Sequence, residues 1–371
     1  MAIGIDISVL GITLEGIGYY TLRLLQKLPS VEDAPCLKFF SYGRRRPPLE
    51  SLGLREEDYR HWGVPGKMAC LLWRGLKWPE VQRFIGQVEL FHATNHLVPP
   101  VRDVPYVLTL YDLFFLKKDK RDCTWEERRY REALSGAVSS ASRIICLSDF
   151  VASEAKERWD LAEDLVDIIP GGVDSFSLPE SVEIVQSTLH RLGVYTPYVL
   201  HVGYQGIRKN LSLLVEGFVR LAQEGVHLVL AGREGPSTPE LRLQCEERGI
   251  SHCVHFLGYV GRKDLACLYA GADCFVFPSL EEGFGLPVLE AMSAGVPVVT
   301  SRSGSLPEVT GDAGILVNSS DAEELYQAVH KVLHENLLRE TLISKGKQRA
   351  AQYSWDETAR KTVASYRKCL S

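Results

Sequence analysis

Short apolar segments alternate with helix-like segments along almost the whole chain, and this alternation restricts the possible folds more than any other feature of the sequence. In the first half the expected strands are residues 2–6, 37–42, 89–93, 106–112, 143–148 and 166–170. In the second half they are residues 198–203, 227–232, 253–258, 274–278, 297–301 and 314–317. Strands separated by helices form parallel sheets that carry helices on both faces. We therefore predict an α/β protein with two Rossmann-like, doubly wound domains.

The length of the chain also favours two domains, because 371 residues exceed one ordinary domain and allow each half its own core. Strand signals lapse between residues 174 and 196, so we place the domain boundary near 186. The predicted parts are an N-terminal domain at 1–186, a C-terminal domain at 187–352 and a final helix at 353–371 that crosses back to the N-terminal domain. Ligands of such sheets bind at the carboxyl ends of the strands, so we expect the site in a cleft between two facing domains.

The composition excludes some classes of function. A net charge of −5 does not suit a protein that coats nucleic acid, which needs an excess of Lys and Arg. The nine cysteines include no Cys-x2-Cys pair, the spacing typical of zinc sites and redox couples. An acid at position 6 does not fit a signal peptide, and no apolar run is long enough to span a membrane. We therefore expect a cytoplasmic protein.

The most informative motif lies between Pro278 and Pro297, where a strand end is followed by a glycine-rich turn and by a helix that starts near Pro287. The exposed amides of a helix N-terminus receive anions such as phosphate. Glu282 and Glu290 lie about two helical turns apart, so both can border one elongated ligand. Carboxylates accept hydrogen bonds from hydroxyls, which a nucleotide sugar presents on its sugar and its ribose. The alternative is a glycine-rich turn with one solvated glutamate and one on a helix surface.

A second motif, between His201 and Asn210, joins a strand to a helix through a basic loop. Arg208 and Lys209 can neutralise a diphosphate leaving group without a metal. Asn210 can cap the helix that follows. That helix has one apolar stripe, formed by Leu211, Leu214, Val215, Phe218 and Leu221. The alternative interpretation is a loop of solvated basic residues.

Polar residues and glycines also follow strands of the first half. The loop after the first strand contains Gly16 and Gly18, which let the backbone approach a ligand but also occur in α/β proteins for packing reasons alone. His92 and Asn95 end another strand. Histidine and asparagine at such places can orient or deprotonate an acceptor hydroxyl. For His92 a core histidine satisfied by the backbone is an equally open interpretation.

Tyr111 and Asp112 end the next strand and complete the candidate acceptor-side residues. Tyr111 can donate and accept a hydrogen bond, but a tyrosine with an ordinary pKa near 10 is a poor base at neutral pH. Asp112 or His92 would then take part of any proton-handling role.

The segment from Pro278 to Pro297 resembles the Glu-x7-Glu signature of glycosyltransferase family 4, a large family of retaining enzymes with the GT-B fold. The resemblance implies that Glu282 contacts hydroxyls of the donor sugar and Glu290 those of the ribose. The backbone around Val260 would bracket the nucleotide base. The turn residues expected to meet the diphosphate or the sugar are Gly283, Phe284, Gly285 and Leu286.

The basic loop is similar to the Arg-Lys-Asn element of the same family, in which Lys209 matches the lysine that holds the diphosphate. Tyr204 stands where many relatives carry a second arginine, so Arg208 would have to supply that charge. Gly16 and Gly18 match the N-terminal glycine-rich loop and would face the diphosphate.

The family usually has a His-Asp pair where this chain has Tyr111 and Asp112. The reaction of such relatives occurs on the front face, where the departing phosphate oxygen takes the acceptor proton, so neither a dedicated base nor a metal is required. The resemblance implies catalytic roles for Glu282, Asp112, Lys209 and Arg208.

The whole pattern looks most like bacterial mannosyltransferases of O-antigen and exopolysaccharide assembly. This implies transfer of mannose from GDP-mannose to a saccharide or polyprenyl-linked saccharide acceptor, with an α-glycosidic bond as the product. The open alternatives are a UDP-glucose or dTDP-rhamnose type of donor, a GT-B epimerase or phosphorylase, and a non-catalytic protein that binds nucleotide sugars.

Residues 67–84 mix aromatic and aliphatic side chains with cations. Such a segment can rest on an anionic membrane surface, here the cytoplasmic face of the inner membrane, and receive a lipid-linked acceptor. The alternative is an ordinary amphipathic helix that covers the sheet.

Overall fold

The computed structural model describes residues 1–11, 16–117, 125–174, 179 and 181–370, and the chain divides into two compact units. Unit 1 contains Met1–Gly172 and Ser354–Ser371, and unit 2 contains Val173–Tyr353. The predicted boundary at 186 falls inside a helix, α7 (Val182–Leu192), that packs on unit 2. Leu189 of α7 is buried there beside Gly271, so this helix is part of the second core and not a linker.

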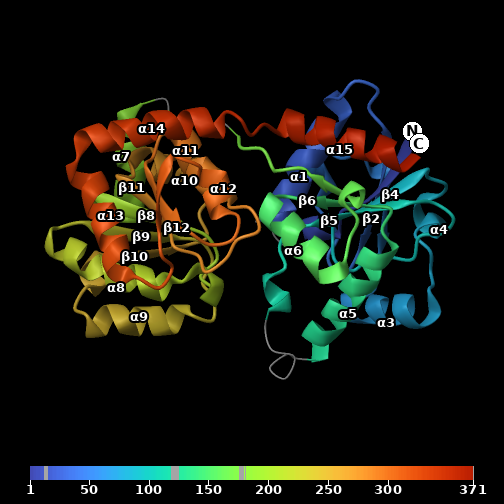
Figure 1. The fold of residues 1–371 in the computed structure, drawn as a ribbon, viewed down its shortest axis with the longest axis horizontal. Coiled ribbons are helices and arrows are strands. Elements are labelled where there is room, and N and C mark those ends of the chain that lie inside the picture. The colour runs from blue at the N-terminus through green and yellow to red at the C-terminus, as the bar shows by residue number, and fades with distance from the viewer. Residues whose placement is uncertain (12–15, 118–124, 175–178, 180, 371) are drawn as a thin grey trace. The chain divides into compact units, whose positions relative to one another are not determined.

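Unit 1 is built on a parallel sheet that is flanked by helices (Figure 1). The strand order is β3-β2-β1-β4-β5-β6-β7. Its strands are β1 (Ala2–Asp6), β2 (Cys36–Tyr42), β3 (Tyr59–Trp62), β4 (Leu90–Ala93), β5 (Tyr106–Leu110), β6 (Arg143–Cys146) and β7 (Val166–Ile168). The sequence analysis missed β3, a short edge strand that pairs only with β2 and includes Arg60 and His61. An edge strand needs no continuous apolar run, so its pattern is weak.

The helices of unit 1 cover this sheet and include the C-terminal helix of the chain. They are α1 (Ile17–Lys27), α2 (Leu49–Leu52), α3 (Gly66–Leu76), α4 (Gln82–Ile85), α5 (Trp125–Ser140), α6 (Asp149–Trp159) and α15 (Trp355–Leu370). Helix α15 packs on α1, β4 and β5. Its predicted apolar side, Ala359, Val363 and Tyr366, is buried, and Trp355 at its start packs edge-on against Tyr20. The core of unit 1 therefore depends on residues from both ends of the chain.

Unit 2 repeats the architecture with the strand order β10-β9-β8-β11-β12-β13, all parallel. Its strands are β8 (Tyr198–Val202), β9 (His227–Ala231), β10 (Val254–Gly258), β11 (Cys274–Phe277), β12 (Val298–Ser301) and β13 (Gly314–Val317). Besides α7 its helices are α8 (Leu211–Gln223), α9 (Thr238–Glu247), α10 (Arg262–Gly271), α11 (Leu286–Ala294), α12 (Leu306–Thr310), α13 (Ala322–His334) and α14 (Asn336–Ala350). All strands predicted for this half are present, which confirms the α/β fold class with two Rossmann-like units.

Short 3-10 helices connect several of these elements. They are η1 (Ser8–Gly11), η2 (Leu28–Ser30), η3 (Glu56–Asp58), η4 (Phe114–Leu116), η5 (Glu163–Leu165), η6 (Ile207–Lys209) and η7 (Ser251–Cys253). In the described part of the chain no helix is both long and apolar enough to cross a membrane.

Helix α8 shows how the core of unit 2 forms. Its predicted apolar stripe is buried against β-strands and α13. The predicted cap was wrong, because Asn210 makes no side-chain capping bond and has a left-handed backbone with φ of 54°. Its side-chain nitrogen, Nδ2, instead donates to the carbonyls of Pro278 (3.1 Å) and Ser319 (2.8 Å). Asn210 therefore ties the loop after β8 to the segments after β11 and β13.

Candidate functional site

The order of each sheet reverses at one pair of neighbouring strands, β1 and β4 in unit 1 and β8 and β11 in unit 2. Ligands of open parallel sheets bind at the carboxyl ends of the strands beside such a reversal. In unit 2 the loops after β8 and β11 contain the two main motifs of the sequence. The amide of Leu280 donates to the carbonyl of Arg208 (2.9 Å), so the backbones of the two loops are joined.

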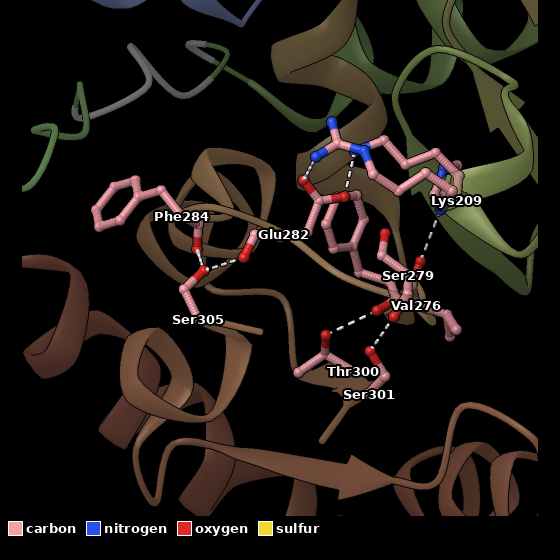
Figure 2. A network of polar contacts seen from close by, with 11 residues as sticks. Lys209, Val276, Ser279, Glu282, Phe284, Thr300, Ser301 and Ser305 are labelled. Atoms are coloured by element: carbon pink, nitrogen blue, oxygen red, sulfur yellow. Dashed lines mark hydrogen bonds and ion pairs between the residues drawn. The ribbon is translucent and has the colours of Figure 1, made fainter. Parts of the chain in front are cut away.

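This junction places Lys209 and Arg208 on the buried carboxylate of Glu282 (Figure 2). The Nζ of Lys209 lies 2.5 Å from Oε1 and the Nη1 of Arg208 lies 3.4 Å from Oε2. Glu282 is only 6% exposed. Burial would raise the pKa of Glu282, but the two cations outweigh it and hold the pKa below its ordinary value. The three ionised groups together carry one net positive charge, as an anion-binding site needs.

Lys209 is itself largely buried and packs on an aromatic ring. Its Nζ lies 4.5 Å from the centre of the Phe277 ring, a distance suited to a cation–π contact. Gly203 lies beside the lysine stem, because a Cβ on this glycine would lie 3.4 Å from the Cε of Lys209, an ordinary van der Waals contact. The side chain is 12% exposed, which restricts its motion and keeps its ammonium beside Glu282.

The turn that carries Glu282 is fixed by hydroxyl groups from the neighbouring strand and the loop that follows it (Figure 2). The Oγ of Ser305 lies 2.9 Å from the carbonyl oxygens of both Glu282 and Phe284 and shares its one hydrogen between them. Thr300 donates to the carbonyl of Phe277 (2.7 Å), and Ser301 donates to that of Ser279 (2.5 Å). These bonds position the carboxylate through its backbone.

The loop then enters α11 as the sequence predicts, with Gly285 at the N-cap and Pro287 in the first turn. The amide groups at a helix N-terminus have no partner within the helix and favour anions. Gly285 has a φ of 102°, which only glycine adopts without strain. Phe284 is buried and packs edge-on against Tyr353 at 5.8 Å. Gly283 is buried and Leu286 is half-buried, so the predicted turn residues form one compact segment.

Glu290, on the same helix, has a different cation partner. Arg262 Nη1 donates to its Oε1 (3.0 Å), and Tyr269 donates its hydroxyl to Oε2 (3.2 Å). Burial raises the pKa of Glu290, and the opposing effect of Arg262 does not cancel it. Arg262 begins α10 two positions after Val260, so this contact places the loop after β10 beside α11. Val260, Glu290 and Glu282 therefore all belong to the carboxyl edge of the same sheet.

The candidate residues of unit 1 are dispersed. Gly16 is the N-cap of α1 with a φ of 48°, and Gly18 is buried one position inside the helix; residues 12–15 of the glycine-rich loop lie outside the described residues. His92 is fully buried in β4, with Nδ1 2.7 Å from the Tyr366 hydroxyl and Nε2 2.7 Å from Thr109. Burial lowers its pKa to about 3. Of its two interpretations the geometry favours the core histidine, because both ring nitrogens already have partners.

Asn95, Tyr111 and Asp112 lie at the carboxyl edge as predicted, but with different exposure. Asn95 is half-buried and donates to the hydroxyl of Tyr42 (3.1 Å). Tyr111 is 6% exposed, with its hydroxyl 3.3 Å from Thr21. Burial raises the pKa of Tyr111 well above its ordinary value, which excludes it as a base near pH 7. Asp112 is half-buried after β5.

Two family models match the chain. The model described as Glycosyltransferase Family 4 matches residues 15–175, and the model described as Glycosyl transferases group 1 matches residues 190–349. The O-antigen chain mannosyltransferase B of Escherichia coli is 30% identical to this chain, and the match covers 95% of this chain and 96% of that protein. This chain belongs to glycosyltransferase family 4. It is therefore an enzyme of the glycosyltransferase class.

The chain is also similar to a longer mannosyltransferase and to a solved structure. The serotype-specific mannosyltransferase WbdA of Escherichia coli is 30% identical over 75% of this chain, which spans only 36% of that longer protein. The crystal structure of Anabaena HepE in complex with UDP and glucose matches with a TM-score of 0.77 at 20% identity and covers 99% of both chains. At this identity the likeness shows the fold alone, which is GT-B.

Sequence reasoning missed several residues of this glycosyltransferase. Thr300, Ser301 and Ser305 follow or end β12, and their only sequence signal is hydroxyl residues at the end of a strand. Arg262 had no signal, because its partner Glu290 lies far away in sequence. In these cases the contact arises from the strand order, which a linear pattern does not contain.

Two further residues missed by the sequence analysis lie at the carboxyl edge of unit 1. Asp6 ends β1, is fully buried, and accepts from Ser8 only through Oδ1; its Oδ2 has no hydrogen-bond partner among the described residues. His96 follows β4, and its buried Nδ1 likewise has no partner there. Burial lowers the pKa of His96 despite the opposing charge of Asp112. Both groups are thus driven toward their neutral forms.

Proposed function

We propose that this enzyme transfers a sugar from a nucleotide-sugar donor to a hydroxyl of a saccharide or polyprenyl-linked saccharide, with retention and formation of an α-glycosidic bond. The observation that carries the proposal is the buried cluster of Glu282, Lys209 and Arg208 at the carboxyl edge of unit 2. It combines surplus positive charge, which suits a diphosphate, with a carboxylate that accepts from sugar hydroxyls.

Each part of the nucleotide sugar has a proposed partner in unit 2. Lys209, Arg208 and the amides of residues 283–286 hold the diphosphate, and Glu282 orients the sugar. Glu290 accepts from the ribose hydroxyls, in place of part of its present contact with Arg262. The backbone around Val260 borders the base.

The chemistry follows from this charge distribution. Negative charge develops on the departing diphosphate, and fixed cations in a partly buried site stabilise it strongly. The departing phosphate oxygen takes the acceptor proton, so the reaction uses neither a metal nor a separate base. In unit 1 we assign Gly16 and Gly18 to the diphosphate, and Asn95 and Asp112 to the acceptor side. Tyr111, whose hydroxyl is buried against Thr21, we interpret as a packing residue beside them.

GDP-mannose is our first choice of donor. The full-length Escherichia coli relative is a mannosyltransferase, which supports mannose as the sugar. HepE, a structural neighbour, was crystallised with UDP and glucose, so UDP-glucose is the main alternative, followed by dTDP-rhamnose. The base contacts proposed here are backbone contacts, so the side chains of the site do not decide between these donors.

The deciding experiment is a thermal-shift and calorimetric screen of GDP, UDP, dTDP and ADP, and of their sugars, in the presence of EDTA. We expect one nucleotide family to stabilise the wild type and to lose this effect in Lys209→Ala. The matched control is Lys345→Ala, which removes a lysine ion-paired to Asp312 on the surface of the same unit. The proposal fails if no nucleotide stabilises the wild type, or if both lysine variants respond alike.

We further propose that α3 rests on an anionic membrane at the cytoplasmic face, where a lipid-linked acceptor would arrive. Ala69 and Trp73 face the core, while Met68, Leu71 and Trp78 are 53%, 46% and 47% exposed. Lys67 and Lys77 are exposed beside them. Apolar side chains flanked by cations are typical of helices that bind anionic interfaces.

Sedimentation with vesicles tests this surface. We expect the enzyme to bind vesicles rich in anionic phospholipid, to bind zwitterionic vesicles weakly, and to lose binding in Leu71→Ser with Trp78→Ser. The control is Leu337→Ser, which removes an 80% exposed leucine from unit 2. Equal binding by both variants would exclude α3 as the membrane surface.

A further inference from the structure

A cluster of two histidines and one glutamate lies at the end of unit 2 remote from the proposed donor site. Glu224 follows α8 as its C-cap residue, and His330 and His334 occupy the last turns of α13. Lys209 lies two positions before the start of α8, whose 13 residues span roughly 20 Å, so α8 separates the cluster from the donor site. The reaction proposed above makes no use of these three side chains.

The three groups bring their potential ligand atoms close together. The Nε2 atoms of His330 and His334 lie 3.9 Å and 3.8 Å from the same oxygen, Oε2 of Glu224. The potential ligand atoms all lie within 4.8 Å of one another. In a tetrahedral zinc site, with bonds of about 2.1 Å, ligand atoms are roughly 3.4 Å apart. The two imidazole rings are stacked, with centroids 4.1 Å apart and an interplanar angle of 20°. These half-exposed side chains therefore bind one ion after the rings turn toward each other and the ligand atoms approach by about 1 Å.

The tautomer that the neutral ring of His334 adopts suits a metal. Its Nδ1 lies 2.9 Å from the carbonyl of His330. A carbonyl only accepts, so Nδ1 carries the hydrogen and the Nε2 lone pair of the neutral ring is directed away from it. Metal-bound histidines commonly donate a hydrogen bond from the N–H of their other ring nitrogen in this way.

The glutamate is oriented by a second contact. Tyr326 donates its hydroxyl to Oε1 of Glu224 (3.3 Å), which leaves Oε2 toward the histidines. Tyr326 is buried at 6% exposure, and Arg220 stacks over its ring at 3.8 Å. The carboxylate is thus positioned by a packed residue that is not itself a ligand.

We infer that Glu224, His330 and His334 bind a divalent transition-metal ion, Zn²⁺ in the first place, that joins the end of α8 to α13. A site of two imidazoles and one carboxylate favours Zn²⁺ over Mg²⁺ and Ca²⁺, because Mg²⁺ and Ca²⁺ take mainly oxygen ligands. The ligand side chains are 37%, 53% and 32% exposed for His330, His334 and Glu224, so an ion can enter and water can complete its coordination. The ion stabilises unit 2 and supplies no chemistry to the transfer reaction.

Calorimetric titration of the metal-free enzyme with Zn²⁺ tests the inference. We expect one ion per chain, a rise in melting temperature with Zn²⁺ but not Mg²⁺, and at least a tenfold loss of affinity in His334→Gln. Tyr326→Phe removes only the orienting hydroxyl and is expected to weaken binding by roughly 10-fold. The matched control is His190→Gln, an exposed histidine in the last turn of α7 that should leave binding unchanged.

Two other groups of residues compete for the same ion. His227 and His255 lie 2.9 Å apart through Nδ1 and Nε2, and the chain contains nine cysteines. If His227→Gln abolishes binding and His334→Gln does not, the assigned site is wrong. Titration with Co²⁺ tests the cysteines, because thiolate ligands add charge-transfer absorption; such a band that persists in His334→Gln would equally overturn the inference.

Discussion

The carboxyl edges of the two sheets share a topology and differ in how they hold charge. In unit 2, Glu282 is ionised in a buried cluster because Lys209 and Arg208 compensate its burial. In unit 1, Asp6 is buried without a cation partner among the described residues, and burial raises its pKa to about 6. His96, at the same edge, has a lowered pKa for the same reason. One edge thus pairs its buried carboxylate with cations, and burial at the other edge shifts the pKa values of Asp6 and His96 toward their neutral forms.

This difference matches the two halves of a glycosyl transfer. A diphosphate leaving group needs fixed positive charge, whereas an acceptor presents neutral hydroxyls that bind through neutral donors and acceptors. In the proposed function the same doubly wound scaffold therefore serves two binding tasks, and the strand-end residues distinguish them. The four predictions that follow test whether charge on one edge and neutrality on the other are both required.

The largest effect is expected where the paired charge is broken. Lys209→Met leaves Glu282 buried with only Arg208 at 3.4 Å, and removing one member of a buried pair costs about 3 kcal/mol of unfolding free energy. It should also lower kcat/KM by roughly 10²- to 10³-fold, since the leaving group loses its nearest cation. Urea unfolding and steady-state kinetics measure the two effects separately.

The double variant Lys209→Met with Glu282→Gln separates charge balance from catalysis. It should recover most of the stability, because the buried side chain at position 282 no longer carries a charge, and none of the activity. Lys345→Met, which breaks a surface pair with Asp312, is expected to change neither quantity appreciably. A double variant as unstable as Lys209→Met would show that the lysine acts by packing rather than by charge.

The second prediction concerns Asp6, whose folded pKa of about 6 exceeds its unfolded value of 3.8. Between these values the folded state binds more protons than the unfolded state, so the free energy of unfolding falls as pH rises. Asp6→Asn keeps an acceptor for Ser8 and removes the charge. The variant should therefore gain stability relative to wild type between pH 4 and pH 7, by up to about 3 kcal/mol.

Urea unfolding of both proteins at several pH values measures this gain. Asp264→Asn is the control, since this aspartate lies on the surface of unit 2 in an ion pair with Arg191. A stability difference between wild type and Asp6→Asn that does not change with pH would mean that Asp6 is ionised in the fold at no cost, and the contrast between the edges would disappear.

The sequence predicted the sheets of this enzyme better than the partners within its sites. The ion pair between Lys209 and Glu282 could be expected from the sequence, because both residues follow apolar strands and such strand ends meet at one edge of the sheet. The role of Ser305 could not be expected, because its hydroxyl contacts two backbone carbonyls, and a sequence pattern does not show which carbonyls lie near a side chain. The boundary at 186 was misplaced since an amphipathic helix between domains packs equally well on either one.

His96 in unit 1 is a second residue whose position could not be predicted from the sequence pattern. The sequence analysis weighed His92, which the fold places in the core, while His96, four positions further along, lies at the edge with Asp112. Both histidines are compatible with the linear motif. Only the point at which β4 ends, Ala93, separates a core position from an edge position.

The third prediction tests His96 as an acceptor-side residue. His96→Gln should lower kcat/KM for the acceptor by about tenfold through loss of a hydrogen bond, while the affinity for the nucleotide stays unchanged. His61→Gln is the control, because His61 is a half-buried histidine of the same sheet whose Nδ1 is bonded to Ser41 (2.8 Å). Acceptor kinetics and nucleotide calorimetry on both variants measure the split. If His96→Gln lowers kcat/KM for the acceptor and the affinity for the nucleotide by equal factors, His96 supports the fold and does not contact the acceptor.

The smallest effect is expected at Tyr111, the position where relatives usually carry histidine. Its hydroxyl is buried against Thr21 and its ring packs edge-on against Tyr20 at 5.5 Å, so we interpret it as a packing residue. Tyr111→Phe should cost about 1 kcal/mol of stability and change kcat/KM by less than about threefold. Tyr366→Phe, which removes the hydroxyl bonded to the core residue His92, should behave similarly. A hundredfold loss of activity in Tyr111→Phe alone would mean that this hydroxyl reaches substrate, and that the edge of unit 1 uses a tyrosine where its relatives use a histidine.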